Sequence, residues 1–550
     1  MKLAAGAGQR SYGILKQILK LINFNNGSTL DPIVTAVLKD QNKWNKLKKQ
    51  ANRKKILIAT SMADYSHGSD LDRVLAIALT ERGHKISFAL CNSDLLACQI
   101  IKYSSYKPNE LLNSTSTPRC SSCSSHINKD FLPLGLAIYN FEKRISNELN
   151  LKSELKQLDM DSLRNFVVSG VEIGTHAWAG AVRYFASTDF VKEVEAKDIL
   201  IRFIISGVRI SESVKEIIQE FSPDIIVAHH GIYVPQGILS EIARVNDIEL
   251  MTWTPSYRTG TFIFSPGESY HYSMISEPIS SWENISLTKK QIKLLNTYMD
   301  SRNSGKNDWI KFSDTKIEKQ EVPIDLSDFF LLLTSVSWDA ELHYESRAFA
   351  NMREWIAESI QFFKDNPGEK LIIRVHPAEL TSPNVSREPM ADYVNSLNIS
   401  SYPNIILLGP DCTVSTYDLI KKSKSVIIYN TKTGIEAAYA GKPVIVAGEA
   451  WIKGKNIGWD AYNKEEYIKI LNQFKENIDM NLEMKNNSIK YAYHFFFKRM
   501  IKVKLFSTPK ENRLIPNKIS LKTIIGKKDK NFQAILDSIE KNATPVGYHH

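Results

Sequence analysis

Residues 425–448 read SVIIYNTKTGIEAAYAGKPVIVAG, and this stretch decides the expected fold. The β-branched run 425–430 predicts a buried strand, the helix formers at 434–440 predict a short helix, and 443–448 predict a second buried strand. Gly441 stands where a glycine commonly ends a helix. Two apolar strands joined by a helix indicate a right-handed parallel crossover, so the stretch predicts one unit of a doubly wound α/β sheet.

The turn between this strand and this helix is the first candidate for a binding site. It brings hydroxyls, backbone N–H groups and a cation to the carboxyl end of a parallel strand, at the start of a helix. α/β sheets bind phosphates at such places. Glu436 follows one turn into the helix and is placed to reach a ribose or sugar hydroxyl. The candidate donor-binding residues of the turn are Thr431, Lys432, Thr433, Gly434 and Glu436.

Two earlier strands of the same expected sheet also end in polar loops. The apolar run at 328–334 leads into a loop that contains Ser335, Ser337 and Trp338, and the run at 370–375 ends at Arg374 and His376. Because parallel strands end at one edge of a sheet, these loops and the turn at 431–434 are expected to converge on one ligand.

The first half of the chain predicts another parallel sheet, without a GxGxxG dinucleotide fingerprint. The strand that opens at Lys54 is followed by a loop with Asp64 and His67, which is either a capped helix connection or a catalytic edge. A later strand ends at His229 and His230, again at a ligand-binding edge. Glu268 lies in the segment 257–272, which we expect to be a polar loop. The candidate catalytic residues are Asp64, His67, His230 and Glu268.

Length, charge and cysteine content narrow the function classes. A chain of 550 residues is too long for a single core, so two domains with extensions are expected. The formal net charge of +10 favours an anionic partner, such as a nucleotide, an acidic glycan or the inner face of a membrane. The basic residues are dispersed and form no nucleic-acid-binding motif, so no nucleic acid is expected. Five cysteines in so long a chain favour a reducing compartment.

Cys120, Cys123 and His126 have a metal-like spacing, but a four-ligand zinc site would need a further partner such as Cys91 or Cys98. We favour an ordinary loop there and expect no metal. No run is as long as a membrane helix requires, so a cytoplasmic protein, or one peripheral at the inner membrane, is expected. The helical pattern at 11–22 fits either a helix packed on the protein or a helix on a membrane surface.

The expected organisation has five parts. An N-terminal helical extension is expected at 1–52, an acceptor domain with a helical, cysteine-containing insertion at 53–280, and a linker at 281–325. A nucleotide-sugar-binding domain at 326–480 and a helical crossover with a tail at 481–550 complete the chain. Both domains are predicted to be Rossmann-like.

The second domain resembles a known enzyme family. Its His376-Pro377 pair, its turn followed by Gly-x-Glu-Ala, its Gly-Lys-Pro-Val-Ile strand and its aromatic, glycine-bearing loop at 449–461 are similar to the capsular polysaccharide biosynthesis family of bacterial glycosyltransferases. That family includes the Kdo transferases of capsule assembly. The resemblance covers residues 325–465, and Lys432 departs from it, because the family often has a small residue there.

The resemblance implies a GT-B architecture, in which two Rossmann-like domains face each other across a cleft. It also implies that His376, Thr431, Thr433, Gly434 and Glu436 contact the donor nucleotide and its phosphates. The expected function is metal-independent and cofactor-free transfer of a sugar from a nucleotide-activated donor to a growing bacterial surface glycan or glycolipid, in a capsule or lipopolysaccharide. The alternatives are a sugar-nucleotide 2-epimerase, a non-catalytic glycan-assembly protein and a glycerol-phosphate polymerase.

Overall fold

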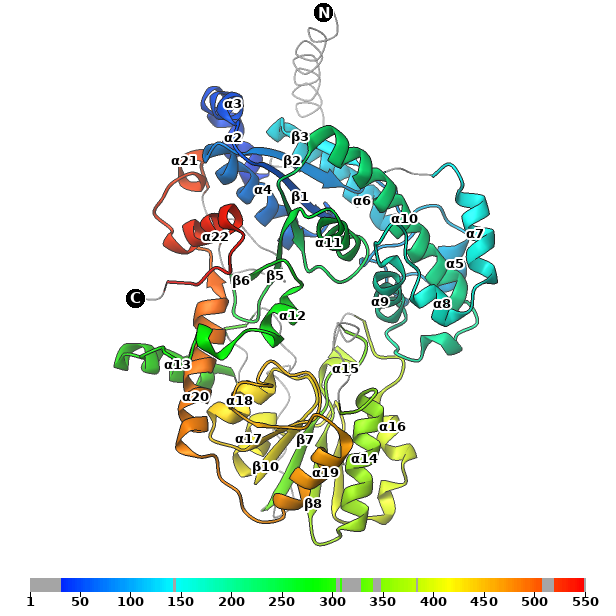
Figure 1. Cartoon of the computed structure of the whole chain (residues 1–550), viewed down its shortest axis with the longest axis vertical. Helices are drawn as coiled ribbons and strands as arrows, with labels where there is room; N and C mark the ends of the chain where they lie inside the picture. The colour runs from blue at the N-terminus through cyan, green and yellow to red at the C-terminus, as the bar shows by residue number, and fades with distance from the viewer. Residues whose placement is uncertain are drawn as a thin grey trace, which may run out of the picture.

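The computed structural model of the chain describes residues 31–141, 145–302, 307–308, 328–339, 348–381, 384–506 and 519–548. The helix expected at 11–22 and residues 303–306 and 309–325 of the expected linker lie outside these residues. Two sheets organise the described chain, one above the other in Figure 1. We call the first sheet with the helices packed on it the first lobe, and the second sheet with its helices the second lobe.

The first sheet has the order β13-β6-β5-β4-β1-β2-β3. Its first five strands in sequence run parallel, whereas β6 pairs antiparallel with β5, and β13 pairs antiparallel with β6. Ignoring β13, the order 3-2-1-4-5-6 is that of a doubly wound fold. The strands are β1 (Lys55–Ser61), β2 (Lys85–Leu90), β3 (Ala137–Asn140), β4 (Ile225–His229), β5 (Glu249–Pro255), β6 (Thr261–Pro266) and β13 (Ile501–Lys502).

The second sheet repeats this order. Read from its other edge it is β9-β8-β7-β10-β11-β12, again 3-2-1-4-5-6, and all its pairings are parallel. The predicted doubly wound α/β class is confirmed for both sheets. The strands are β7 (Phe329–Leu333), β8 (Lys370–Arg374), β9 (Ile405–Leu408), β10 (Ser425–Ile428), β11 (Val444–Val446) and β12 (Trp459–Asp460).

Each sheet is buried on both faces, which explains why its strands read as continuous apolar runs. In β7, Phe329 and Leu331 pack into the core on one face, and Phe330 and Leu332 pack into the core on the other. The stretch 425–448 folds as expected, as strand, helix and strand. Gly441 has φ +78° just after the helix, a conformation that favours glycine.

Helices cover both faces of both sheets. In the first lobe and at its edge they are α2 (Pro32–Lys39), α3 (Gln41–Gln50), α4 (Ser66–Glu81), α5 (Pro108–Leu112), α6 (Pro118–His126), η1 (Ile127–Phe131), η2 (Leu132–Leu134), α7 (Glu148–Gln157), α8 (Met160–Arg164), α9 (Ile173–Phe185), η3 (Phe190–Lys192), α10 (Ala196–Phe221), α11 (Gln236–Val245), α12 (Tyr270–Ile275), η4 (Ile279–Ser281), α21 (Leu521–Ile524) and α22 (Lys530–Lys541). The remaining helices are α13 (Lys289–Arg302), α14 (Met352–Asp365), α15 (Ala378–Thr381), α16 (Met390–Ser396), η6 (Ile399–Ser401), α17 (Thr416–Lys422), α18 (Thr433–Tyr439), α19 (Lys464–Gln473), α20 (Leu482–Tyr493) and η7 (His494–Arg499).

Two local expectations were wrong. The segment 257–272, expected as a polar loop, contains the buried strand β6 and the helix α12. Its Thr261 hydroxyl is satisfied inside the protein, since Oγ1 donates to the Arg258 carbonyl and lies within hydrogen-bonding distance of Ser256 Oγ. The cysteine-containing stretch, expected as a loop, forms α6, because Pro118 begins a helix well and Thr117 precedes it.

The chain passes between the lobes along one side of the molecule. After α12 it reaches α13, and it returns through α20, η7 and β13 to end in α22 on the first lobe (Figure 1). Away from these connections, ion pairs join the lobes directly. Arg387 lies 2.7 Å from Glu193, and Arg353 lies 3.1 Å from Asp189.

Candidate active site

The strand order of the second sheet reverses between β7 and β10, and three predicted donor loops meet at this place. Ser335, after β7, donates a hydrogen bond to the side chain of Asn430, after β10. The His376 N–H, after β8, donates to Thr334 Oγ1 at 3.0 Å. Open α/β sheets bind ligands where the strand order reverses. The three loops therefore meet at one edge of the sheet, as expected, and their binding of a common ligand stays a prediction.

The turn after β10 is tightly folded. The Thr433 N–H donates to Thr431 Oγ1 at 3.3 Å, and the two threonine hydroxyls lie 3.2 Å apart. Gly434 lets α18 approach the sheet, because a Cβ at this position would overlap the Ile428 side chain. The backbone and hydroxyls of the turn are thus held at the sheet edge by local bonds.

Behind the turn lies a buried ion network. The Glu436 carboxylate forms ion pairs with Arg302 Nη2 at 2.8 Å and with Lys432 Nζ at 3.0 Å. It also accepts a hydrogen bond from the Tyr417 hydroxyl at 2.8 Å. Arg302 also pairs with Asp308. Burial opposes ionisation of Glu436, but the Arg302 and Lys432 cations outweigh it and lower the pKa of Glu436 to about 2. In this structure Glu436 and Lys432 therefore fasten the turn to the linker helix α13.

Other predicted donor residues also have protein partners. Arg374 donates to the carbonyl oxygens of Gly409 and Cys412, so it holds the loop after β9. Trp338 is buried and packs into the core of the first lobe, with its indole N–H donating to Ser386 at 2.8 Å. Ser337 is half-buried in the same loop.

His376 is electrically neutral near pH 7. Burial, reinforced by the Lys432 and Arg374 cations, lowers the pKa of its imidazole to about 4. Its Nδ1 accepts from the Ala378 N–H at 3.0 Å, so this nitrogen is unprotonated and the proton sits on Nε2. His376 therefore brings no positive charge to this place.

The first sheet has its own reversal, between β1 and β4. Gln236, at the start of α11, joins the two strands through a 2.6 Å hydrogen bond from Nε2 to the Thr60 carbonyl. His230, directly after β4, has φ +67°, and its N–H donates to the Trp253 carbonyl at 2.8 Å. A bulky residue with positive φ is uncommon, and such conformations occur often at functional sites.

His230 also has a strongly perturbed pKa. Burial lowers the pKa to about 4, with the nearby Asp339 carboxylate opposing this change and Arg183 adding to it. Its Nδ1 has no hydrogen-bond partner among the described residues. A neutral imidazole with an unpartnered nitrogen at a ligand-binding edge can accept a proton.

The two reversals lie at one interface between the lobes. The Tyr233 hydroxyl, from the loop after β4, donates to Asp339 Oδ1, from the loop after β7, at 2.7 Å. Arg183 lies 3.2 Å from the same carboxylate and stacks over the Tyr233 ring at 5.1 Å. Lys432 Nζ stands 4.7 Å from the centre of the Tyr257 ring, which extends the contact along the interface.

Aromatic rings continue this interface toward α12. The Trp451 ring, from the loop after β11, lies 5.6 Å from the ring of His271 and 6.1 Å from that of Tyr257. The His230 ring lies 5.4 Å from that of Tyr270. An aromatic wall of this kind suits a base or a sugar ring.

Asp64 and Glu268, two other predicted catalytic residues, have partners away from this contact. Asp64 accepts from Ser122 at 2.8 Å and pairs with Arg119 at 3.1 Å, both on α6. The His67 backbone lies in the first turn of α4, and its side chain is outside the described part of the chain. Glu268 pairs with Arg244 at 3.1 Å. Of the three whose side chains the structure describes, Asp64, His230 and Glu268, His230 is the one placed beside a loop of the second lobe.

Sequence reasoning did not select several residues of this interface. Tyr233 and Asp339 are 106 positions apart, and Arg183 comes from a helix in the insertion. A local signal existed for Tyr233, because it lies three residues after His230 in the same loop. Nothing local marked Arg302 as the partner of Glu436.

The cysteine pair of α6 gathers no metal site in the described part of the chain. No group of three or more His, Cys, Asp or Glu side chains suited to a metal ion occurs among the described residues. His126 instead pairs with Asp130, at 2.6 Å, one turn further along.

Two doubly wound sheets that meet at their strand-order reversals define a two-domain, Rossmann-like protein of GT-B type. Residues 288–496, which contain the whole second sheet, match the family model described as capsule polysaccharide biosynthesis protein. The match indicates similarity to that family over this segment, which is less than half of the chain.

Solved structures give distant likenesses. The Thermosulfurimonas dismutans KpsC beta Kdo 2,7 transferase is 14% identical, with 58% of this chain and 90% of that chain covered and a TM-score of 0.33. The beta Kdo 2,4 transferase from the same organism is 10% identical, with coverages of 55% and 88% and a TM-score of 0.33. A UDP-GlcNAc 2-epimerase from Neisseria meningitidis is 12% identical, with coverages of 80% and 95% and a TM-score of 0.24. A search of curated proteins finds no match.

Among the helices that the structure describes, none is both long enough and apolar enough to cross a bilayer.

Proposed function

We propose that this protein transfers a sugar from a nucleotide-activated donor to a growing bacterial surface glycan. The observation that carries the proposal is the meeting of the two strand-order reversals, bridged by Tyr233 and Asp339. A donor held at one reversal and an acceptor held at the other would meet at a single interface. The match of residues 288–496 to the capsule polysaccharide biosynthesis family model makes a capsular glycan our favoured acceptor.

The donor belongs on the second lobe in this proposal. The hydroxyls of Thr431 and Thr433 and the N–H groups of their turn would hydrogen-bond the donor's phosphates. His376, neutral near pH 7, would add a hydrogen bond. Lys432 would supply charge, although burial beside Arg302 lowers its pKa to about 8. No metal ion is part of the proposal, so a chelator should leave turnover unchanged.

The acceptor belongs on the first lobe, and His230 is our choice of base. Its neutral imidazole would take the proton of an acceptor hydroxyl as that oxygen bonds to the anomeric carbon. The bond from the anomeric carbon to the phosphate oxygen breaks, and the nucleotide leaves with the electron pair. Closure of the lobes would exclude water, which would otherwise consume the donor.

A thermal-shift screen against CMP-, UDP-, GDP- and dTDP-sugars tests the proposal. A donor present at 100 times its dissociation constant should stabilise the protein by about 2.7 kcal/mol. The matching free sugars serve as controls, because they lack the phosphates that the second lobe is proposed to hold. If no nucleotide-sugar raises the melting temperature, the proposal is wrong. Conversion of the donor alone into an epimer would favour the epimerase.

The contact between the reversals gives a second test. The Asp339→Ala substitution removes the partner of Tyr233 and Arg183, and we expect turnover to fall roughly tenfold or more as the loops lose their alignment. Because the Asp339 side chain is half exposed, the free energy of unfolding should change by less than about 1 kcal/mol. Asp339→Asn keeps an acceptor for Tyr233 and should lose less activity. Full activity of Asp339→Ala would show that the contact has no catalytic importance.

A further inference from the structure

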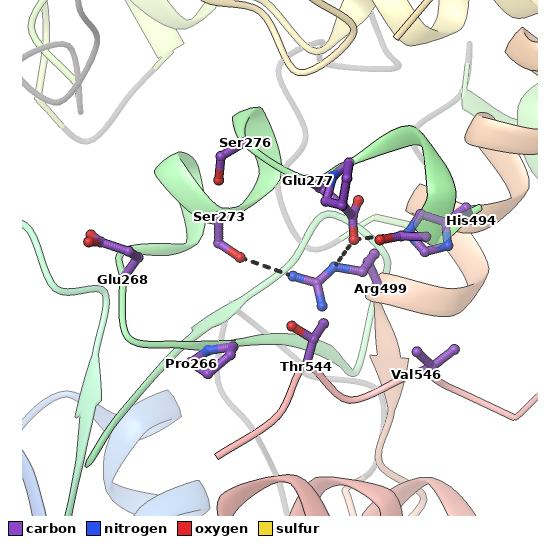
Figure 2. Close-up of a pocket in the computed structure, with 11 residues that line it drawn as sticks. Pro266, Glu268, Ser273, Ser276, Glu277, His494, Arg499, Thr544 and Val546 are labelled. Carbon is purple, nitrogen blue, oxygen red and sulfur yellow. Dashed lines mark hydrogen bonds and ion pairs between the residues drawn. The ribbon is translucent and has the colours of Figure 1, made fainter. Parts of the chain in front are cut away.

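A cavity of about 470 Å³ lies outside the interface described above, behind α12. Three separate parts of the chain enclose it: the segment 266–281 around α12, the π-helical turn η7, and residues 544–546 near the C-terminus (Figure 2). Its volume falls in the range of small-molecule sites, roughly 300–1,000 Å³. None of the sequence motifs pointed to it.

A buried polar cluster forms one wall of this cavity. The Glu277 carboxylate lies 3.1 Å from His494 Nε2 and 3.2 Å from Arg499 Nε, and Arg499 Nη2 donates to Ser273 Oγ at 3.5 Å. Figure 2 shows the guanidinium between Ser273 and Glu277, with Thr544 beneath it. Arg499 is only 1% exposed.

The cluster contains one hydrogen-bond donor and one hydrogen-bond acceptor that have no partner among the described residues. Arg499 Nη1 and Glu277 Oε2 are buried, and neither has a hydrogen-bond partner among the described residues. An unpaired buried donor or acceptor costs roughly 1–3 kcal/mol, so such pairs of atoms are usually satisfied by a ligand or by ordered water. Here a donor and an acceptor stand unsatisfied in one cluster.

The backbone explains how this wall is built. η7 is a single π-helical turn between α20 and β13, and His494 and Arg499 are its first and last residues. Hydrogen bonding from i to i+5 brings residues with this spacing to the same face, whereas an α-helix would separate them. π-helical turns are rare and occur frequently at functional sites.

The chemistry of the lining selects the ligand class. Hydroxyls of Ser273, Ser276, Ser281 and Thr544 line the cavity, together with the two carboxylates of Glu268 and Glu277 and one guanidinium. Glu277 already pairs with Arg499, so this guanidinium brings no net positive charge that would favour an anion. A sugar hydroxyl both donates and accepts, so it can satisfy Arg499 and Glu277 together.

We propose that this cavity is a saccharide-binding subsite, which holds a non-reacting sugar unit of the glycan at a distance from the reaction. That the bound sugar is a non-reacting unit of the glycan substrate rests on the proposed function. The helix α12 connects the two places, since its Tyr270 and His271 rings lie toward Trp451 at 6.3 and 5.6 Å while Ser273 and Ser276 line the cavity. A sugar held behind α12 would thus be one helix away from the aromatic wall.

Saturation-transfer NMR on the full chain tests the subsite with neutral probes, namely glucose, galactose, N-acetylglucosamine and N-acetylgalactosamine. We expect at least one probe to bind. The Ser276→Trp substitution should fill the cavity and weaken that binding at least tenfold. Tyr272→Trp is the matched control, because Tyr272 is an exposed α12 residue outside the lining, and it should bind like the parent protein.

Three results would overturn the inference: no probe binds, binding survives Ser276→Trp, or crystals soaked with the probe hold only ordered water in the cavity. Inorganic phosphate is a further probe, and displacement of the sugar by phosphate would also refute a neutral saccharide site. The nucleotide-sugar thermal shift should persist in Ser276→Trp. A shift without sugar binding rejects the subsite alone, and sugar binding without a shift rejects the proposed function alone.

Discussion

The His230→Ala substitution is expected to lower the turnover number by roughly 10²–10⁴-fold, the usual loss when a general base is removed. The reason is the position of His230 after β4, beside the Asp339 loop of the second lobe, with Nδ1 unpartnered among the described residues. Donor affinity should change little, because the donor is proposed to bind the other lobe. Single-turnover kinetics together with donor titration separate the two effects.

Asp64→Asn is the control for this experiment, because Asp64 is the competing candidate whose partners lie on α6. If Asp64→Asn abolishes turnover while His230→Ala spares it, the base has been assigned to the wrong residue. A near-wild-type rate in both variants would move the base elsewhere in the first lobe.

The pH profile gives an independent readout on His230. The imidazole must be neutral to accept a proton, and burial lowers its pKa to about 4. Turnover should therefore be retained as the pH falls through 6.5, the ordinary value for histidine, and should be lost only near pH 4. An acid limb near pH 6.5 would point to an ordinary, solvated histidine instead.

The second large effect concerns stability. The Glu436→Ala substitution should lower the free energy of unfolding by about 3–5 kcal/mol, because in a buried site it leaves Lys432 without its carboxylate and Arg302 with one carboxylate, Asp308, instead of two. Arg302 and Lys432 both depend on this carboxylate, whose side chain is 2% exposed. Urea unfolding measures the loss. Glu358→Ala, which breaks the exposed pair with Lys464, is the control and should cost less than about 1 kcal/mol.

The same carboxylate predicts acid sensitivity. The Arg302 and Lys432 cations outweigh burial and hold the folded-state pKa of Glu436 at about 2, below the ordinary value near 4.3 of the unfolded chain. A lowered pKa contributes stability that is present above about pH 4.3 and is lost as the pH falls toward 2. The parent protein should therefore lose more stability across this interval than Glu436→Ala does. If the parent protein and Glu436→Ala lose the same unfolding free energy over this interval, the partners of Glu436 do not lower its pKa.

The architecture was predictable because its signals are local. The apolar runs of β7 and β10 and the glycine after α18 identify a parallel α/β unit from neighbouring residues alone. Parallel strands end at one edge, so the convergence of three loops of the second sheet followed from the pattern as well.

The site was predictable only in part, because its contacts join distant residues. Glu436 was selected, but its partner Arg302 is 134 positions away, and Tyr233 meets Asp339 across the two lobes. The strand β6 was not predicted, because the charged Arg258 next to it suggested a surface loop. In the structure the Arg258 guanidinium donates to the Phe496 carbonyl at 2.6 Å and stacks on Phe497 at 4.1 Å. The sequence shows that a residue is polar, but not whether the fold supplies a buried hydrogen-bond partner for it.

The two covalent connections between the lobes, through α13 and through α20 with η7, run along one side of the molecule (Figure 1). Because both connections lie on one side, they form a hinge. The lobes can open by rotating about that side more easily than by moving straight apart. The ion pairs of Arg387 with Glu193 and of Arg353 with Asp189 lie away from this hinge and hold the lobes together. Under the proposed function, a long polymer would enter and leave on the side of these ion pairs, and added salt would weaken them.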